Sequence, residues 1–283
     1  FFSDDATFRA WGLAFSNAIA AAGLVQTADT GQINWGTVTK PGTTNTSAGY
    51  EVWRFNDALQ ATAPVYIKVE YGTAGGAMGL GGLWYTVGQG TDGAGTINVT
   101  PTARYQITIT NYAGNIGFGH VTGAANRLLV MLLAGTAGTS ASYGGAFFSV
   151  ERSHDAIGGD TGDGLIIMGY SQAGGVHQFY YSMASGPGII EKSFGILLPS
   201  GGTGTTGSRI MLSPIFAQKS GVFVNPSMNI LAYCDSSLAK DADISFTYYN
   251  ATRRYCSVGV TNLRSASRNP RGTVVANFLI RNE

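Results

Sequence analysis

The chain has 283 residues, of which 44% are hydrophobic, and a net charge of +1 at pH 7. This length suits one large all-β domain or two smaller ones, and the near-zero charge provides no global field to attract nucleic acid or a membrane surface. Charged residues make up only 12% of the chain, about half of the usual ~25%. Such a composition is typical of assembly interfaces, where charges are depleted, and equally of a β-protein covered by Ser, Thr, Asn and Gly.

The N-terminal segment predicts one α-helix. Ser3 is placed to cap it, Asp4 and Asp5 lie in its first turn where the helix dipole favours them, and Gly23 is suited to end it. Its apolar residues must pack either on the core of the same chain or on a neighbouring subunit. They recur at three- and four-residue spacing and form one stripe: Phe8, Trp11, Phe15 and Ile19.

From residue 50 onward the pattern has period two, which is typical of strands. In residues 65–71 the odd positions are apolar or aromatic, and residues 128–133 form an apolar run typical of a strand buried on both faces. Glycine-rich segments at 89–95 and 158–164 are expected to be turns or loops. The remaining strands are expected near residues 83–87, 104–110, 146–150, 165–168, 176–183, 189–198, 228–233, 244–249, 255–260 and 274–280.

These elements predict a mainly β fold: an antiparallel β-sandwich, or a pair of them, with one N-terminal helix. The apolar alternation lapses near residues 111–119. This lapse suggests a division into an N-terminal helix and β region, 1–115, and a β-sandwich region, 116–283, although the whole chain can also form one domain.

One segment resembles a serine-hydrolase nucleophile elbow. It runs from Gly169 to Gly174, with Ser171 at its centre and alanine in place of the second glycine of the motif. An elbow exposes its serine where a strand turns into a helix. Here the residues that follow predict a strand, and Gly174 and Gly175 predict a hairpin turn. A serine esterase that uses Ser171 is therefore a remote alternative.

The other titratable groups predict no catalytic, cofactor or metal site. Asp160 and Asp163 lack the further ligands of a calcium loop, and none of the three histidines, His120, His154 and His177, has a partner at metal-ligand spacing. Glu151 and Asp155 flank His154 and could build an acid–base group, but an ordinary loop histidine is the simpler interpretation. The carboxylates of Glu51, Asp57 and Glu70 do not show a glycosidase spacing.

The cysteines and the C-terminal arginines are ambiguous. Cys234 and Cys256 are 22 residues apart and without nearby histidines, which excludes a zinc finger but leaves a pair or two buried thiols open. No apolar run reaches the ~20 residues of a membrane span, and the N-terminus lacks a signal-peptide pattern. A solvated basic face or a contact with an acidic subunit would explain the last arginines better than DNA binding does: Arg253, Arg254, Arg264, Arg268, Arg271 and Arg281.

The aromatic–arginine cluster at residues 53–55 most simply fills the core. Trp53 and Phe55 share one strand face, with Arg54 opposite and able to pair with Glu51 or Asp57 at the surface. Exposed aromatic rings could instead stack on sugars of a host receptor.

Three stretches of this chain resemble tailed-bacteriophage virion structural proteins. They are FRAW (8–11) with GLVQTADTGQINW (23–35), YEVWRFNDALQATAPVYIKVEY (50–71) with LWYTVG (83–88), and FFSVER (147–152) with DTGDG (160–164). The resemblance covers a little over half of the chain and supplies no catalytic residues.

The resemblance implies a non-enzymatic virion component, tail- or baseplate-associated, assembled in the bacterial host cytoplasm. Its partners would be copies of itself and other virion proteins, with no nucleic acid, membrane or cofactor. The alternatives are a capsid decoration protein and a module that binds a host receptor or a host surface glycan.

Overall fold

The computed structural model is mainly β, with one N-terminal helix and antiparallel sheets, as the sequence predicts. It describes residues 2–73, 81–99, 102–108, 116–135, 144–155, 159–171, 175–182, 190–191, 194–196, 212–219, 222–233, 243–248, 251–261 and 275–281.

The helix α1 (Asp5–Ala21) forms where its apolar stripe predicts it. Its N-cap is Asp4 rather than Ser3, because the Asp4 carboxylate accepts the backbone N–H of Thr7 at 2.8 Å. The Thr7 hydroxyl in turn accepts the backbone N–H of Asp4, which completes a capping box. Gly23 follows the C-cap with a φ of +98°, a left-handed conformation that glycine adopts without strain. Phe8, Phe15 and Ile19 are buried against the chain's own first sheet, which resolves the alternative left open for the stripe.

The first sheet has the order β1-β2-β3-β4-β7, and all of its neighbours are antiparallel. The predicted alternation of residues 65–71 is confirmed, with the odd positions fully buried and the even ones partly exposed. Its elements are β1 (Val25–Gln26), β2 (Thr46–Arg54), β3 (Tyr66–Thr73), β4 (Gly81–Gly88) and β7 (Tyr105–Thr108), with a short 3-10 helix η1 (Ala58–Ala61) and the small pair β5 (Gly90–Thr91) and β6 (Ile97–Asn98).

The second sheet has the order β13-β12-β11-β10-β9-β8 and is again antiparallel. Residues 128–132 and 165–168 are buried at every position, as expected for strands covered on both faces. Its strands are β8 (Ile116–Ala124), β9 (Arg127–Gly135), β10 (Gly144–His154), β11 (Asp160–Ser171), β12 (Gly175–Ser182) and β13 (Ile190–Glu191).

The third sheet has the order β14-β15-β16-β19-β18-β17. The segment 189–198, expected as one strand, is divided between two sheets, because its first part pairs with β12 and its second part with β15. The strands are β14 (Phe194–Ile196), β15 (Leu212–Lys219), β16 (Val222–Tyr233), β17 (Asp243–Tyr248), β18 (Ala251–Thr261) and β19 (Val275–Arg281).

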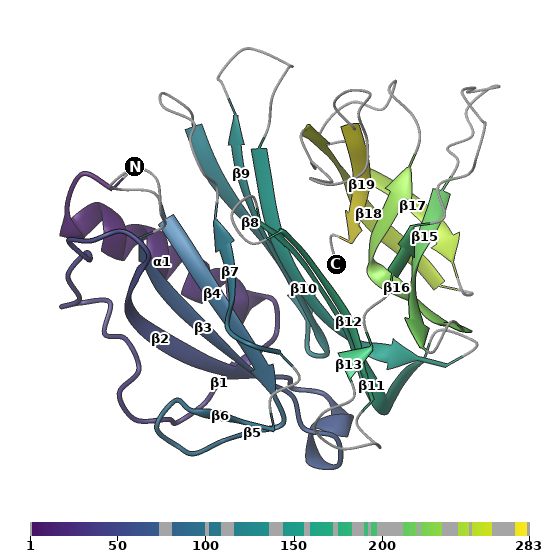
Figure 1. Cartoon of the computed structure of the whole chain (residues 1–283), viewed down its shortest axis with the longest axis horizontal. Helices are drawn as coiled ribbons and strands as arrows, with labels where there is room; N and C mark the ends of the chain where they lie inside the picture. The colour runs from purple at the N-terminus through teal and green to yellow at the C-terminus, as the bar shows by residue number, and fades with distance from the viewer. Residues whose placement is uncertain are drawn as a thin grey trace.

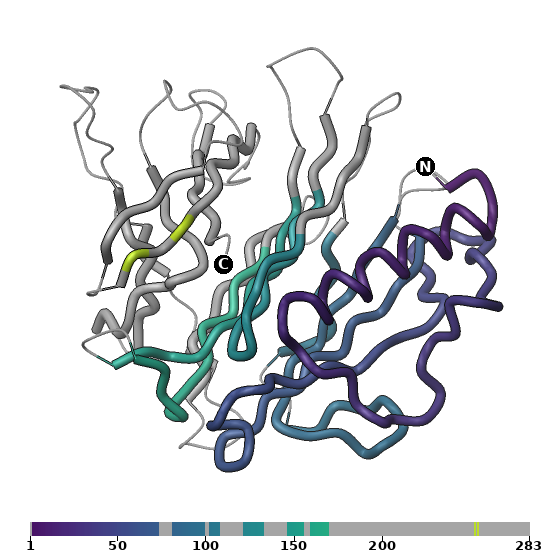
Figure 2. Tube along the Cα trace, turned by 180° about the vertical axis from the view of Figure 1, so that it is seen from behind, coloured from purple at the N-terminus to yellow at the C-terminus, as the bar shows by residue number. Residues whose placement is uncertain are grey.

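The three sheets stack as layers, with the second sheet in the middle (Figure 1). Strand β10 contacts β7 of the first sheet as well as β16 and β18 of the third. Seen from behind, α1 lies across the first sheet on the outside of the molecule (Figure 2). The middle layer is therefore shielded from water on both faces, which explains its continuous apolar runs.

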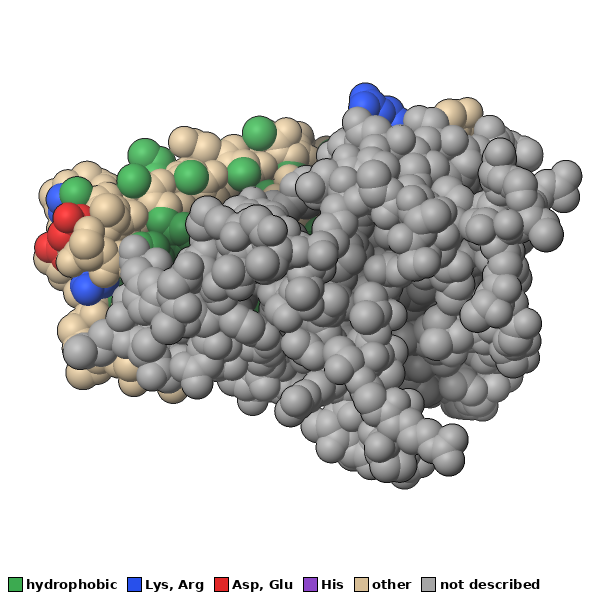
Figure 3. Space-filling model, turned by 90° about the horizontal axis from the view of Figure 1, so that it is seen from above, with side chains coloured by type: hydrophobic (Ala, Val, Ile, Leu, Met, Phe, Trp, Pro, Cys, Tyr) green, Lys and Arg blue, Asp and Glu red, His purple; other side chains and the backbone are tan. Residues whose placement is uncertain are grey.

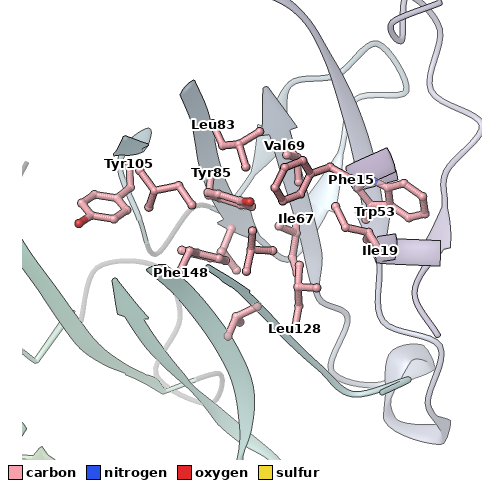
Figure 4. Packing of buried hydrophobic residues seen from close by; sticks show 14 of the residues in the cluster. Phe15, Ile19, Trp53, Ile67, Val69, Leu83, Tyr85, Tyr105, Leu128 and Phe148 are labelled. Carbon is pink, nitrogen blue, oxygen red and sulfur yellow. The ribbon is translucent and has the colours of Figure 1, made fainter. Parts of the chain in front are cut away.

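One hydrophobic cluster joins α1, the inner face of the first sheet and one face of the second sheet. At its centre the Tyr85 ring stacks on Phe148 with 4.2 Å between centroids and an interplanar angle of 6° (Figure 4). The cluster contains residues from both sides of the division suggested at 115/116, and that division stays a prediction.

Two expectations about irregular segments are corrected. Residues 160–164, expected as part of a loop, begin strand β11, and the backbone N–H of Asp155 donates to the Gly159 carbonyl just before this strand. Residues 116–119, where alternation lapses, belong to strand β8, whose regular pairing with β9 was not predicted. Of the strand expected near residues 104–110, residues 109 and 110 lie outside the described residues.

Gly12 allows the closest approach between α1 and the segment that precedes β2. A Cβ at this position would lie 1.9 Å from Cη2 of Trp35. We predict that Gly12→Ala lowers the free energy of unfolding by about 1–3 kcal/mol through overpacking, although alanine favours a helix by about 1 kcal/mol. Gly42→Ala, where a Cβ meets nothing within 4 Å, is the control and should stay within about 0.5 kcal/mol. Urea unfolding followed by tryptophan fluorescence measures both; equal stability of the two variants would contradict this packing.

Candidate functional site

Glu51 is a buried carboxylate at the junction of four segments. It is 1% exposed. One oxygen accepts Ser16 Oγ at 2.7 Å and Trp35 Nε1 at 2.9 Å, and the other accepts Trp53 Nε1 at 3.2 Å and the Tyr71 hydroxyl at 2.6 Å. These neutral donors come from α1, the segment before β2, β2 itself and β3. Four donors suit an ionised carboxylate, which only accepts hydrogen bonds.

Tyr71 is held in its donor form at this junction. Burial, together with the charge of Glu51, raises the pKa of Tyr71 well above its ordinary value. The Tyr71 ring also packs edge-on against Trp35, with 4.9 Å between centroids. Glu51 and its four donors therefore form a buried structural hydrogen-bond network, and they do not form an acid or base that faces solvent.

Arg152 connects the second sheet to the residues around η1. Its side chain is fully buried, and Nη2 donates to Asp57 Oδ1 at 2.9 Å while Nε donates to the other carboxylate oxygen. Nη1 donates to the Ala63 carbonyl at 2.9 Å, and the guanidinium lies 5.4 Å from the centroid of Phe55. A bidentate pair of this kind combines charge with fixed geometry. It therefore holds the first and second sheets in one relative position.

His154 lies between two carboxylates, one of which differs from the predicted partner. Nε2 is 3.4 Å from Glu151 Oε2, and Nδ1 is 3.2 Å from Asp160 Oδ1, an ion-pair contact outside hydrogen-bond geometry. Asp155, expected as a flanking group, accepts the backbone N–H of Gly159 at 2.8 Å. Burial alone would lower the pKa of His154, but the carboxylates of Asp160 and Glu151 beside the two ring nitrogens raise it to about 9.

The structure corrects the expected partners of Arg54. Glu51 and Trp53 face inward and Arg54 lies on the opposite side of β2, because alternate residues of a strand point to opposite faces. Arg54 donates to the Phe55 carbonyl, whereas Asp57 pairs with Arg152. Trp53 and Phe55 are 2% and 0% exposed, so these two rings fill the core as predicted and offer no stacking surface.

Ser171 does not lie in a strand–turn–helix elbow. It ends β11 and is paired with Gly175 of the antiparallel strand β12. Asp160 is engaged by His154 and Asn126, and Asp163 is exposed. Within the described ranges, no group of three or more His, Cys, Asp or Glu side chains could hold a metal ion.

Several predicted groups lie where the structure describes little or nothing. The strands that carry His120, His177 and Cys256 are described, but their side chains are not, and Cys234 lies outside the described residues. Of the C-terminal arginines, Arg254 is exposed, while 264, 268 and 271 are outside the described ranges. In the part of the chain that is described, no helix has the length and apolar character needed to span a membrane.

The outward side of α1 is a candidate interaction surface that the sequence analysis missed. Leu13 is 44% exposed and is one of two large hydrophobic residues that stand out in the described part of the chain. In Figure 3 a row of hydrophobic side chains crosses the described surface at upper left, and charged side chains lie at its left edge. We define the outer face of α1 by its exposed residues, none of which is charged: Ala6, Thr7, Ala10, Leu13, Ala14, Asn17, Ala20 and Ala21. The i, i+4 spacing of Ala6, Ala10 and Ala14 was the available signal.

No family model, no curated protein and no solved structure matches this chain. The resemblance carried by the strings within residues 8–164 stays a prediction.

Glu51→Gln tests whether the buried carboxylate is needed as an acceptor. A glutamine brings an NH₂ donor toward two other donors, so the variant should lose about 2–4 kcal/mol of unfolding free energy. Glu70→Gln is the matched control, because Glu70 pairs with Arg104, whose side chain is 45% exposed, and exposed pairs contribute about 0–1 kcal/mol. Denaturant titration at pH 7 compares the two variants. A Glu51→Gln variant as stable as Glu70→Gln would show that the fold does not need the Glu51 carboxylate as an acceptor.

Arg152→Met tests the lock between the first two layers. The variant leaves Asp57 without its cation and should cost about 3 kcal/mol or more. The double variant Asp57→Asn/Arg152→Met removes both charges and should recover part of that loss. A double-mutant cycle measures the coupling, and a double variant that costs the full sum of the single variants would show that the two residues are independent.

Proposed function

We propose that this chain is a non-enzymatic structural component of a tailed-phage virion that assembles through repeated subunit interfaces on the tail or baseplate side. The outer face of α1 is the observation that carries the proposal. It presents eight exposed residues without a charge, whereas a solvated helix face ordinarily carries charged and polar residues. Depletion of charge is what distinguishes the centre of a protein interface from the rest of a surface.

The buried polar groups also support a structural role. Glu51, Arg152 and His154 are each engaged by several groups in the interior of the chain. They join helix to sheet, sheet to sheet and strand to strand. The hydrogen-bonded groups of Glu51 and Arg152 are of the kind that makes a fold rigid and unique. A rigid subunit loses little conformational freedom when it assembles, so weak contacts repeated by symmetry are sufficient.

The sequence strings that carry the family resemblance contain residues that form buried polar contacts. Trp35 and Trp53 donate to Glu51, and Arg152 binds Asp57. These residues belong to GLVQTADTGQINW, to YEVWRFNDALQATAPVYIKVEY and to FFSVER. We infer that the strings mark the internal frame of the subunit, whereas assembly uses the surface outside them.

We predict that Leu13→Glu weakens self-association or association with other virion proteins about tenfold or more, because it places a charge in the middle of an uncharged interface. Ala103→Glu, at an exposed position in the connection between β6 and β7, is the control and should associate like the wild type. Size-exclusion chromatography with light scattering over a concentration series provides the measurement. A wild-type chain that stays monomeric and binds no other virion protein would count against the proposal.

Immunogold labelling of the intact particle distinguishes the tail or baseplate from the capsid. Label on the capsid surface would favour the decoration alternative while keeping the structural role.

A further inference from the structure

The two ring nitrogens of His154 each face a carboxylate; that of Glu151 is buried, and the side chain of Asp160 is 32% exposed. His154 is 5% exposed and Glu151 is 1% exposed. The carboxylates come from different strands, Glu151 from β10 and Asp160 from β11. The side chain of Asp160 also accepts Asn126 Nδ2 from the turn between β8 and β9. Two strands therefore meet at the imidazole ring, and the β8–β9 turn joins them through the carboxylate of Asp160.

A wide irregularity in β11 creates this meeting point. Arg152 is opposite Leu165, and His154 is opposite Asp160, so two steps on β10 (154 − 152) correspond to five steps on β11 (165 − 160). The three extra residues fall in the glycine-rich segment 160–164. Irregularities of this kind change the direction in which side chains point, and they are regular features of sheets rather than defects. Here the extra residues bring the carboxylate of Asp160 to the histidine.

The charges around the ring balance only when the ring is protonated. Among the described residues, Glu151 of its own strand and Asp160 of β11 face the ring, and Arg127 of β9 lies directly opposite Glu151 in the sheet. The neighbouring Arg152 has its own partner, Asp57, at the interface with the first layer. Two carboxylates, one arginine and one imidazolium sum to zero.

We propose that Glu151, His154, Asp160 and Asn126 form a proton-dependent clasp, in which the protonated His154 holds the end of β10, the start of β11 and the β8–β9 turn together, and its deprotonation opens this corner of the middle sheet. A neutral imidazole has one N–H, and its second nitrogen becomes an acceptor. One carboxylate would then face a lone pair, and the group of four charged side chains would carry a net negative charge beside the buried ring. The clasp does not depend on the assembly proposal.

The direction of the pH effect follows from the ring's surroundings. The pKa of His154 is about 9 in the folded chain against an ordinary value of 6.5. The stabilisation is therefore present in full below pH 6.5 and is lost as the pH rises through 9. Over that range the folded-to-unfolded ratio should fall on the order of 100-fold from this one group.

Two measurements on the full chain test the clasp. NMR titration of the three histidines should show one ring that titrates near pH 9 and that is missing in His154→Gln. Urea unfolding of the wild type between pH 6 and pH 10 should show the loss of stability, and His154→Gln should lack this component. The difference between the two curves removes contributions from tyrosines and lysines.

Asp160→Asn provides a second route if His154→Gln does not fold. It should shift the high titration toward pH 7 while the fold is retained, and Asp163→Asn, an exposed change in the same segment, should leave it unchanged. Backbone amide shifts of residues 124–127 and 159–162 should move with the His154 titration. Three histidines that all titrate between pH 6 and 7, or a wild type and His154→Gln with the same pH dependence, would overturn the clasp.

Discussion

The N-terminal half of the structure depends on a single buried carboxylate. Among the described residues no cation contacts Glu51, and its two oxygens accept hydrogen bonds from two indoles, a phenol and a serine hydroxyl. Because each donor comes from a different segment, the helix, the connection before β2 and two strands can satisfy the carboxylate only in one relative arrangement. An apolar residue at this position would fill space, but it would not choose among alternative packings; a buried acceptor with four donors does.

The interior charges divide according to the layers they connect. Arg152 and Asp57 join the first and second layers, whereas His154 joins two strands and a turn within the second. Strand β10 carries both, since residues 151–154 are all buried there. A strand in a middle layer has no solvent face on which to place polar side chains, so each of them must find a partner in the interior. Strand β10 therefore provides both the polar contacts between the first two sheets and those within the second sheet.

The lack of charged residues on the outer face of α1 agrees with the proposal that this surface contacts other subunits. The helix uses its aromatic stripe for the chain's own core and presents small uncharged residues outward. Small residues let a neighbouring backbone approach closely, and an uncharged face has little desolvation cost to overcome on association. The proposed assembly surface and the proposed clasp are separate, since the first is the outer face of α1 and the second lies at one corner of the second sheet.

The sequence by itself determined what depends on local periodicity. The helix with its buried stripe, the alternation of β3, the doubly buried run 128–132 and the inward position of Trp53 and Phe55 were all predicted, because spacing of 3.6 or 2 dictates which residues share a face. Only the tertiary structure decided the partners of the charged groups. The sequence offered Glu51 or Asp57 as a partner of Arg54, and Glu151 with Asp155 as partners of His154, since sequence neighbours were the available candidates. The actual partners are Tyr71 and the indoles for Glu51, and Asp160 for His154. They are brought together by sheet register, which depends on pairing between distant segments and is invisible to local pattern.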